Sequence, residues 1–289
     1  MRKVHVVGSI NADFVIQTET LPRAGETIGG GSFMAVPGGK GANQALAARR
    51  LGADVMLHAS VGDDEFAQLA LTHLQADGVD LSRIILKVGA PTGIAFINLA
   101  ADGENQIAVA SGANAAFSGP DIAPATINDD DMVIAQLEIA EAPILAALDA
   151  NSAFFCLNTA PALPLSDALF ARAQLLVMNE IEAAAYADQL TRFDGLVAQT
   201  YGARGAALFR NGQQIAQAEP PVVQAVDTTG AGDTFTGALA VALSQGMENA
   251  AALQFACAAG ALATTKHGAQ EGMPTRADVD RLIASGSVK

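Results

Sequence analysis

The sequence predicts an α/β protein whose central sheet is mostly parallel and is covered by helices on both faces. Short apolar runs alternate with stretches of helical periodicity through most of the 289 residues. The runs are apolar throughout, which is typical of strands buried on both faces of a parallel sheet. Hydrophobic residues make up 51% of the chain, and no internal repeat or low-complexity linker divides it. We therefore expect one domain over residues 1–289.

The predicted strands and helices follow one another in βαβ order. The expected strands are the apolar runs at residues 4–10, 54–62, 132–138, 154–160, 175–181 and 196–202. Stretches such as residues 42–53 and 65–78 place Ala and Leu at spacings of three and four, which predicts amphipathic helices. Because ligands of parallel sheets bind beyond the carboxyl ends of the strands, we expect the functional site there.

Two segments break this order, because each contains strand-like stretches and turn residues with no helix between them. They cover residues 14–37 and 93–111, and the second contains ADGEN between two alternating arms, a hairpin signal. We interpret both as a small β-sheet that stands off the main sheet as a lid. The alternative is that they extend one edge of the main sheet.

The charge and the cysteine content argue against several classes of partner. A net charge of −14 and a pI near 4.5 argue against nucleic acid and anionic membranes. The N-terminal sequence becomes polar too early for a signal peptide, and no apolar run is long enough to span a membrane. Cys156 and Cys257 each lie in an apolar run, which favours buried reduced thiols over a disulfide. We therefore expect a cytoplasmic protein.

Three small residues, Gly230, Ala231 and Gly232, stand directly before Asp233 in the stretch DTTGAGDTFTGAL. The apolar periodicity of residues 234–246 predicts a helix that begins beside them. The first N–H groups of a helix lack intrahelical partners and lie at the positive end of its dipole, so this stretch suits an anion such as phosphate. The alternative is an ordinary turn in which Asp233 caps the helix.

A second glycine cluster, PGGKGANQALAARRLGA at residues 37–53, also precedes a predicted helix. It fails the P-loop pattern because Lys40 is followed by Gly41, and VVGSIN near the N-terminus fails the dinucleotide-binding pattern. Lys40 and Asn43 nevertheless lie near the start of the helix. The alternative role of these glycines is close packing of a loop against a strand.

Polar side chains follow several predicted strands, where a ligand is expected. Asn11 and Asp13 follow the first strand, and a carboxylate with an amide can hold adjacent sugar hydroxyls. The corresponding residues after later strands are Glu138, Asn179, Glu182, Thr200, Gly202 and Gly205. The four histidines are His5, His58, His73 and His267. Their spacing is not that of metal ligands, so we interpret them as structural or surface residues. Ser9 and Ser111 lack the context of a catalytic nucleophile.

Six motifs together resemble the ribokinase family of carbohydrate kinases. In chain order they are GSINADFV, GGKGANQALAARRLGA, LNTAP, MNEIEA, TYGARG and DTTGAGDTFTGAL, and the resemblance covers essentially the whole chain. It implies a ribokinase-like three-layer α/β fold with a β-sheet lid. It also implies transfer of the γ-phosphoryl group of ATP to the primary hydroxyl of a pentose, with O5 of D-ribose as the expected acceptor.

The resemblance also implies roles for individual residues. The implied base is Asp233, and the backbone of Gly230, Ala231 and Gly232 would hold the transferred phosphoryl group. The implied sugar contacts are Asn11, Asp13, Gly39, Lys40, Asn43, Glu138 and Asp233. The implied ATP contacts are Asn179, Thr200, Gly202, Arg204, Gly205, Gly232 and Cys257. Magnesium would accompany ATP with indirect help from Glu182. The implied potassium site comprises Asp227, Thr229, Ala263, Lys266, Gly268 and Gly272.

Two departures from the family pattern concern the nucleotide side, and the resemblance leaves alternatives open. The stretch 182–196 is shorter than the family's usual helix-bearing segment by about one helix. Cys257 stands where related kinases can carry a larger polar residue. The implied assembly is a homodimer through the lid. The alternatives are a kinase for another furanose or a nucleoside (fructose, deoxyribose or adenosine), a non-catalytic sugar-binding regulator and, more distantly, a dehydrogenase. An intact Asp233 beside residues 230–232 argues against the regulator.

Overall fold

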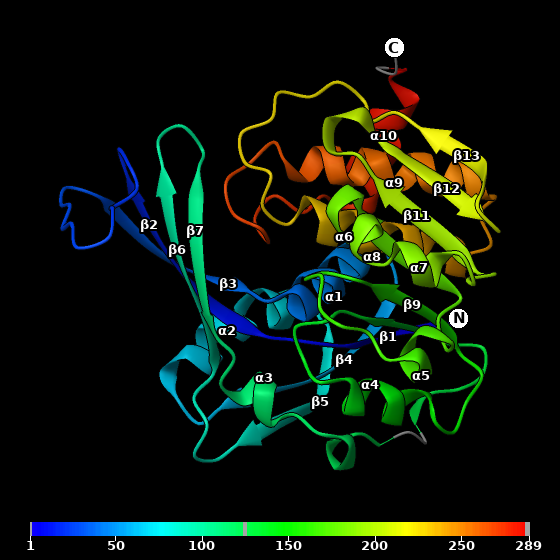
Figure 1. Ribbon diagram of the computed structural model, residues 1–289, viewed down its shortest axis with the longest axis horizontal. Coiled ribbons are helices and arrows are strands. Elements are labelled where there is room, and N and C mark those ends of the chain that lie inside the picture. Colours follow the sequence, from blue (N-terminus) through cyan, green and yellow to red (C-terminus); the bar gives the residue numbers. More distant parts are fainter. Residues whose placement is uncertain (1, 124–125, 287–289) are drawn as a thin grey trace.

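A nine-stranded sheet runs through the centre of the molecule and separates two layers of helices (Figure 1). The structure is a computed structural model that describes residues 2–123 and 126–286. The strand order is β13-β12-β11-β10-β9-β8-β1-β4-β5, and all neighbours pair parallel except at one edge, where β12 is antiparallel to both β11 and β13. The strands are β1 (Lys3–Val7), β4 (Asp54–Gly62), β5 (Asp80–Lys87), β8 (Met132–Ala135), β9 (Phe154–Asn158), β10 (Leu175–Asn179), β11 (Leu196–Thr200), β12 (Ala206–Arg210) and β13 (Gln213–Ala218).

Alternate strand residues face opposite helix layers, as the apolar runs predicted. Val6 and Ile134 pack in one core, whereas Val7 and Val133 pack in the other. The first layer contains α1 (Lys40–Arg50), α2 (Glu65–Ala76), α8 (Ala231–Ser244), α9 (Asn249–Ala263) and α10 (Arg276–Ala284). The second contains α3 (Ala113–Ala116), α4 (Glu141–Leu148), α5 (Asp167–Phe170), α6 (Glu180–Ala185) and α7 (Ala187–Leu190). Two 3₁₀ turns are η1 (Gly119–Asp121) and η3 (Gly202–Arg204).

The predicted small sheet is separate from the main sheet, so the interpretation as an edge extension is wrong. Its order is β3-β2-β6-β7, and β2, β6 and β7 extend away from the helices at the left of Figure 1. The strands are β2 (Asn11–Thr18), β3 (Ser32–Gly38), β6 (Gly93–Ala100) and β7 (Asn105–Ala110). The predicted hairpin joins β6 to β7. Phe14 packs edge-on against Phe66 of α2 with ring centroids 5.2 Å apart, which anchors the sheet to the main body.

The six strands predicted for the main sheet and the three predicted helices are all present, and three further strands of this sheet are new. The new strands are β5, β12 and β13. Residues 182–196 contain only the end of α6, the one-turn helix α7 and the loop before β11, consistent with a shortened segment. Within residues 2–123 and 126–286, no helix combines the length and the apolar character needed to cross a membrane.

Candidate active site

Helix α8 begins at Ala231, three residues earlier than the apolar periodicity predicted. Gly230 is its N-cap in the left-handed conformation, with φ of 76°. The periodicity could not show this start, because Gly and Ala carry too little apolar surface to mark a face. Asp233 is the third helical residue, and no side chain caps the helix. The alternative in which Asp233 caps the helix is therefore wrong.

The carboxylate of Asp233 is buried and is held by two amide side chains of α1. Asn43 Nδ2 donates to Oδ2 and Gln44 Nε2 donates to Oδ1, each at 2.9 Å. Only 7% of Asp233 is exposed, so these two donors take the place of water at its oxygens. The sequence pointed to Asn43 but not to Gln44, although Gln44 is the next residue of the same motif.

A cavity of about 250 Å³ lies between the start of α8 and the carboxyl ends of β9 to β11. Its lining includes Lys40, Asn179, Glu182, Gly230, Gly232 and Asp233. The N–H groups of Gly232 and Asp233 donate to no group within the described part of the chain. The N–H of Ala231, in contrast, donates to Thr228 O at 3.2 Å. Of the three expected anion-binding donors, Ala231 is thus already satisfied, whereas the N–H groups of Gly230 and Gly232 donate to no described residue, and Asp233 adds a free N–H that was not expected.

Lys40 is the cation among four carboxylates that meet at this site. Asp233 raises the pKa of the Lys40 ammonium most strongly; burial lowers it, and Glu138, Glu182 and Asp13 add to the rise. Burial raises the pKa of Asp13 to about 7, and the negative charges of Glu138 and Asp233 act in the same direction. Asp13 Oδ1 is buried without a hydrogen-bond partner among the described residues. A sugar hydroxyl that reached this oxygen would satisfy it.

Further polar groups orient the predicted sugar-side residues. Asn114 Nδ2 donates to Asn11 Oδ1 at 2.8 Å and to the carbonyl of Ile10 at 3.0 Å. Glu138 accepts from Ser9 Oγ at 2.5 Å and from the backbone N–H of Lys40 at 3.0 Å. Gly39, the N-cap of α1, follows directly after the strand that pairs with β2. Asn114 lies in a short turn of small residues, so no sequence pattern pointed to it.

A larger cavity of about 540 Å³ adjoins the first and has mostly apolar walls. Of the predicted ATP contacts, Thr200, Gly202, Gly205, Gly232 and Cys257 line it. Burial raises the pKa of the Cys257 thiol to about 12, so this residue is an apolar wall and not a reactive group. Phe235 and residues 220–223 supply much of the remaining wall.

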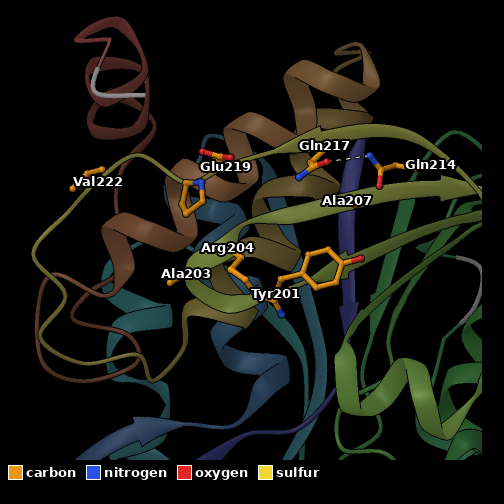
Figure 2. A pocket seen from close by; sticks show the side chains of 9 residues that line it. Tyr201, Ala203, Arg204, Ala207, Gln214, Gln217, Glu219 and Val222 are labelled. Carbon is orange, nitrogen blue, oxygen red and sulfur yellow. Dashed lines mark hydrogen bonds between the residues drawn. The ribbon is translucent and has the colours of Figure 1, made fainter. Parts of the chain in front are cut away.

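Arg204 and Asn179, two more predicted ATP contacts, are placed differently. Asn179 lines the smaller cavity and caps α6 through a reciprocal pair of hydrogen bonds with Glu182. The Arg204 side chain pairs with Glu180 at 2.6 Å and lies over the Tyr201 ring. It lines a separate hollow on the outer face of β12 and β13, shown in Figure 2. The structure therefore does not bring the Arg204 side chain to the apolar cavity of about 540 Å³.

The predicted potassium-site residues meet in the loops beside α8. Asp227 Oδ1 accepts from the Thr229 N–H and Oδ2 from the Gly268 N–H, both at 2.9 Å. Burial would raise the pKa of Asp227, but the hydrogen bonds from these two residues outweigh it and lower the pKa. A side chain at Gly272 would collide with the carbonyl of Ala263, so the two loops approach closely. Lys266 and Gly272 both line a neighbouring surface hollow.

Within the described ranges, no three His, Cys, Asp or Glu side chains gather as metal ligands.

His5, His58 and Cys156 are buried in the core, outside this chemistry. His5 Nδ1 on β1 lies 3.0 Å from His58 Nε2 on β4, and His5 Nε2 lies 3.3 Å from Asp131, which directly precedes β8. Burial lowers the pKa of both imidazoles, that of His58 to about 3, so they are neutral core residues. Cys156 and Cys257 are both buried and unpaired, as predicted.

Comparison with known proteins identifies the family. The model of the pfkB family carbohydrate kinases matches residues 1–276. The ribokinase of Bacillus subtilis (strain 168) is 40% identical over 300 residues, which cover 98% of this chain and 100% of that protein. The crystal structure of Thermotoga maritima ribokinase superposes with a TM-score of 0.89 at 29% identity over 98% of this chain and 100% of that one. Arabidopsis thaliana ribokinase complexed with ribose and ATP gives 0.83 at 33% identity over 98% of each chain. The chain belongs to the pfkB family of carbohydrate kinases and has the ribokinase-like fold.

Proposed function

We propose that this enzyme transfers the γ-phosphoryl group of ATP to the primary hydroxyl of D-ribose and forms ribose 5-phosphate. The observation that carries the proposal is the buried Asp233 carboxylate beside the unpaired N–H groups at the start of α8. A base and an anion site are thereby placed on one helical turn. Relatives named ribokinase, one of them with a solved structure complexed with ribose and ATP, support ribose as the acceptor.

In the proposed reaction, Asp233 accepts the proton of the sugar hydroxyl as that oxygen attacks the γ-phosphorus. Asn43 and Gln44 face its two oxygens with N–H donors, which hold the carboxylate in place beside the anion site. The N–H groups of residues 232 and 233 and the ammonium of Lys40 stabilise charge on the transferred phosphoryl group. We assign the sugar contacts to Asn11, Asp13, Gly39, Lys40, Asn43, Glu138 and Asp233.

The nucleotide is proposed to lie across the two adjoining cavities. The smaller one holds its phosphates near Asn179, and the apolar one holds the base near Thr200, Gly202 and Gly205. Magnesium, when bound with ATP, would neutralise charge on the phosphates. Both oxygens of Glu182 accept hydrogen bonds from Asn179. Glu182 therefore suits contact with the metal's water shell better than direct coordination.

The first test is a substrate panel. We expect kcat/KM for ribose to exceed that for fructose and adenosine, because Asn11, Asp13 and Glu138 offer several polar contacts to a compact polyhydroxyl ligand. A site that bonds a hydroxyl can reject the analogue that lacks it by up to about 10⁴-fold. The panel measures ADP formation with pentoses, hexoses and nucleosides at saturating ATP. A higher kcat/KM for fructose or adenosine would overturn the ribose assignment in favour of another acceptor.

A non-catalytic sugar-binding regulator and a dehydrogenase both fit the site less well than a kinase does. A regulator has no need for a base beside an anion site, yet Asp233 and its two donors are intact. The family assignment overturns the dehydrogenase hypothesis, for which the dinucleotide motif is also missing.

We further propose that potassium activates the enzyme without contacting substrate. A cation held near Asp227, Thr229, Ala263 and the backbone of residues 266–272 would fix the loop that leads into α8. We expect rates in potassium to exceed those in a large organic cation by at least about fivefold at matched ionic strength, a typical coupling between two sites. Equal rates in the two salts would show that the loop needs no cation.

The chain is proposed to form one domain with the small sheet as its lid. The same sheet is proposed to pair two copies of the chain. Large apolar side chains are exposed on it: Ile16, Phe33, Met34, Phe96, Ile107 and Val109. A small sheet cannot bury both faces alone, and its edge strands favour pairing. We expect a dimeric mass by light scattering at micromolar concentration and a monomeric mass for Ile107→Glu. Val88→Glu, at a site that is 84% exposed outside this sheet, is the control and should stay dimeric. A monomeric wild-type protein, with and without ribose, would contradict the proposal.

We propose a cytoplasmic location, where ATP is available. Two buried, unpaired thiols suit a reducing compartment. The acidic composition fits a protein that binds its anionic substrate locally, through backbone N–H groups and one lysine, and not through a broad positive surface.

A further inference from the structure

The two oxygens of Asp233 are each held by one side-chain amide, and these amides differ in what else they contact. Asn43 holds Oδ2, and its own oxygen accepts from Gln270 Nε2 at 3.0 Å. Gln44 holds Oδ1, is fully buried, and is not among the residues that line either cavity. Gln44 therefore reaches the reaction only through Asp233.

The orientation of the Gln44 amide is determined by its neighbours. Its nitrogen donates to Asp233 Oδ1 and to Asn158 Oδ1, both at 2.9 Å, which uses both hydrogens. Its oxygen accepts from Gln136 Nε2 at 2.7 Å. Asn158 is oriented in turn, because its nitrogen donates to the carbonyl of Val177 at 3.1 Å. If the Gln44 amide were reversed, its oxygen would face two oxygen acceptors and its nitrogen would face a donor.

These side chains come from four different elements that meet behind the base. Gln44 lies on α1, Gln136 follows β8, Asn158 ends β9 and Asp233 lies on α8. Helices α1 and α8 approach closely at Gly237, where an added Cβ would lie 3.0 Å from the Gln44 carbonyl. The arrangement fixes Oδ1 of Asp233 through Gln44, which is itself held by the buried side chains of Gln136 and Asn158.

We propose that Gln44 is a positioning residue that fixes the rotamer of the Asp233 carboxylate, and that Gln136 and Asn158 in turn fix Gln44. The inference rests on the proposed role of Asp233 as base, but it does not depend on which sugar is phosphorylated. Without the Gln44 donor, the carboxylate of Asp233 can rotate. Its Oδ1 would then be buried without a hydrogen-bond partner from Gln44. The orientation in which Asp233 can accept the proton of the sugar hydroxyl is then populated less often.

The test is a double-mutant cycle on kcat, with Gln44→Leu in the wild-type and Asp233→Asn backgrounds. In the wild-type background we expect kcat to fall about 10- to 100-fold while KM for sugar and ATP changes by less than about threefold. In the Asp233→Asn background, the same substitution should lower kcat by less than about threefold, because there is no carboxylate left to position. The matched control is Gln214→Leu on β13, where the side chain donates to its neighbour Gln217 and bonds no other described residue (Figure 2). It should leave kcat unchanged.

A second variant protects the test against a folding defect. Gln136→Met removes the donor to Gln44 without touching Asp233, and Gln136 Oε1 already lacks a partner among the described residues. We expect a smaller fall in kcat, of about 3- to 10-fold, that also disappears in the Asp233→Asn background. The cycle uses whichever sugar the wild-type enzyme phosphorylates, so failure with ribose counts against the ribose assignment alone. Equal losses in both backgrounds, or unchanged kcat in the wild-type background, would overturn the role of Gln44.

Discussion

Asp233→Asn is expected to lower kcat by at least about 100-fold while the dissociation constant for ribose changes far less. General-base assistance contributes about 10²- to 10⁴-fold, or roughly 3–5 kcal/mol of barrier. The substitution retains the size of the side chain and most sugar contacts, so the loss falls on the chemical step. Steady-state kinetics gives kcat, and calorimetric titration with ribose gives the dissociation constant.

The matched control is Asp278→Asn, because Asp278 is also the third residue of its helix. It accepts from the cap residue Thr275 on α10, away from both cavities, so only a stability loss of about 1 kcal/mol is expected there. Asp233→Asn should also melt early, since Asn43 and Gln44 would both face it as donors. Normal turnover by a folded Asp233→Asn enzyme would show that this carboxylate has a structural role only.

Gly230→Ala is expected to lower kcat by about 10²- to 10³-fold, the effect typical of a lost oxyanion donor. Gly230 has φ of 76°, and an added Cβ would lie 2.8 Å from the carbonyl oxygen of Ala269 and 2.9 Å from its Cα. Relief of that collision must move the start of α8, and with it the N–H groups of Gly232 and Asp233. Initial rates at saturating ribose and ATP measure the effect.

Gly246→Ala separates backbone strain from displacement of the anion site. Gly246 has nearly the same φ, 77°, but an added Cβ there meets no atom within 4 Å, and it lies just after the other end of the same helix. Both variants should lose about 1–2 kcal/mol of stability from the left-handed conformation. Only Gly230→Ala should lose activity. Similar kcat values for the two variants would remove the start of α8 from the proposed mechanism.

The parallel core was predictable from the sequence because its strands are apolar on both faces. Of the strands that were missed, β5 and β13 are the two edges of the main sheet, where one face or both meet solvent, and β12 lies beside β13. QQIAQA at β13 and DLSRIILK at β5 therefore mix polar and apolar residues without a clear period. The start of α8 was misplaced for a related reason, since Gly and Ala mark no helix face.

The residues of the candidate site that lie in glycine motifs or after strands were predictable from the sequence. The residues that hold them in place by hydrogen bonds were not. Gln44, Asn158 and Asn114 act through contacts between elements far apart in the chain, and nothing in their local sequence reveals those partners. Arg204 shows the opposite error. Gly202 and Gly205 of the same motif line the apolar cavity, yet the Arg204 side chain turns toward Glu180 and away from it. Motif position alone does not determine where a long side chain points.

The Asp233 carboxylate and the start of α8 are together proposed to phosphorylate the primary hydroxyl of ribose. Phosphorus NMR of the product formed from ribose and magnesium ATP examines this reaction at the atom that receives the phosphate. We expect one phosphomonoester, coupled to the two protons on C5, in equal amount to the ADP formed. A phosphate on another ring oxygen, or ADP formation that does not depend on ribose, would contradict the proposed reaction.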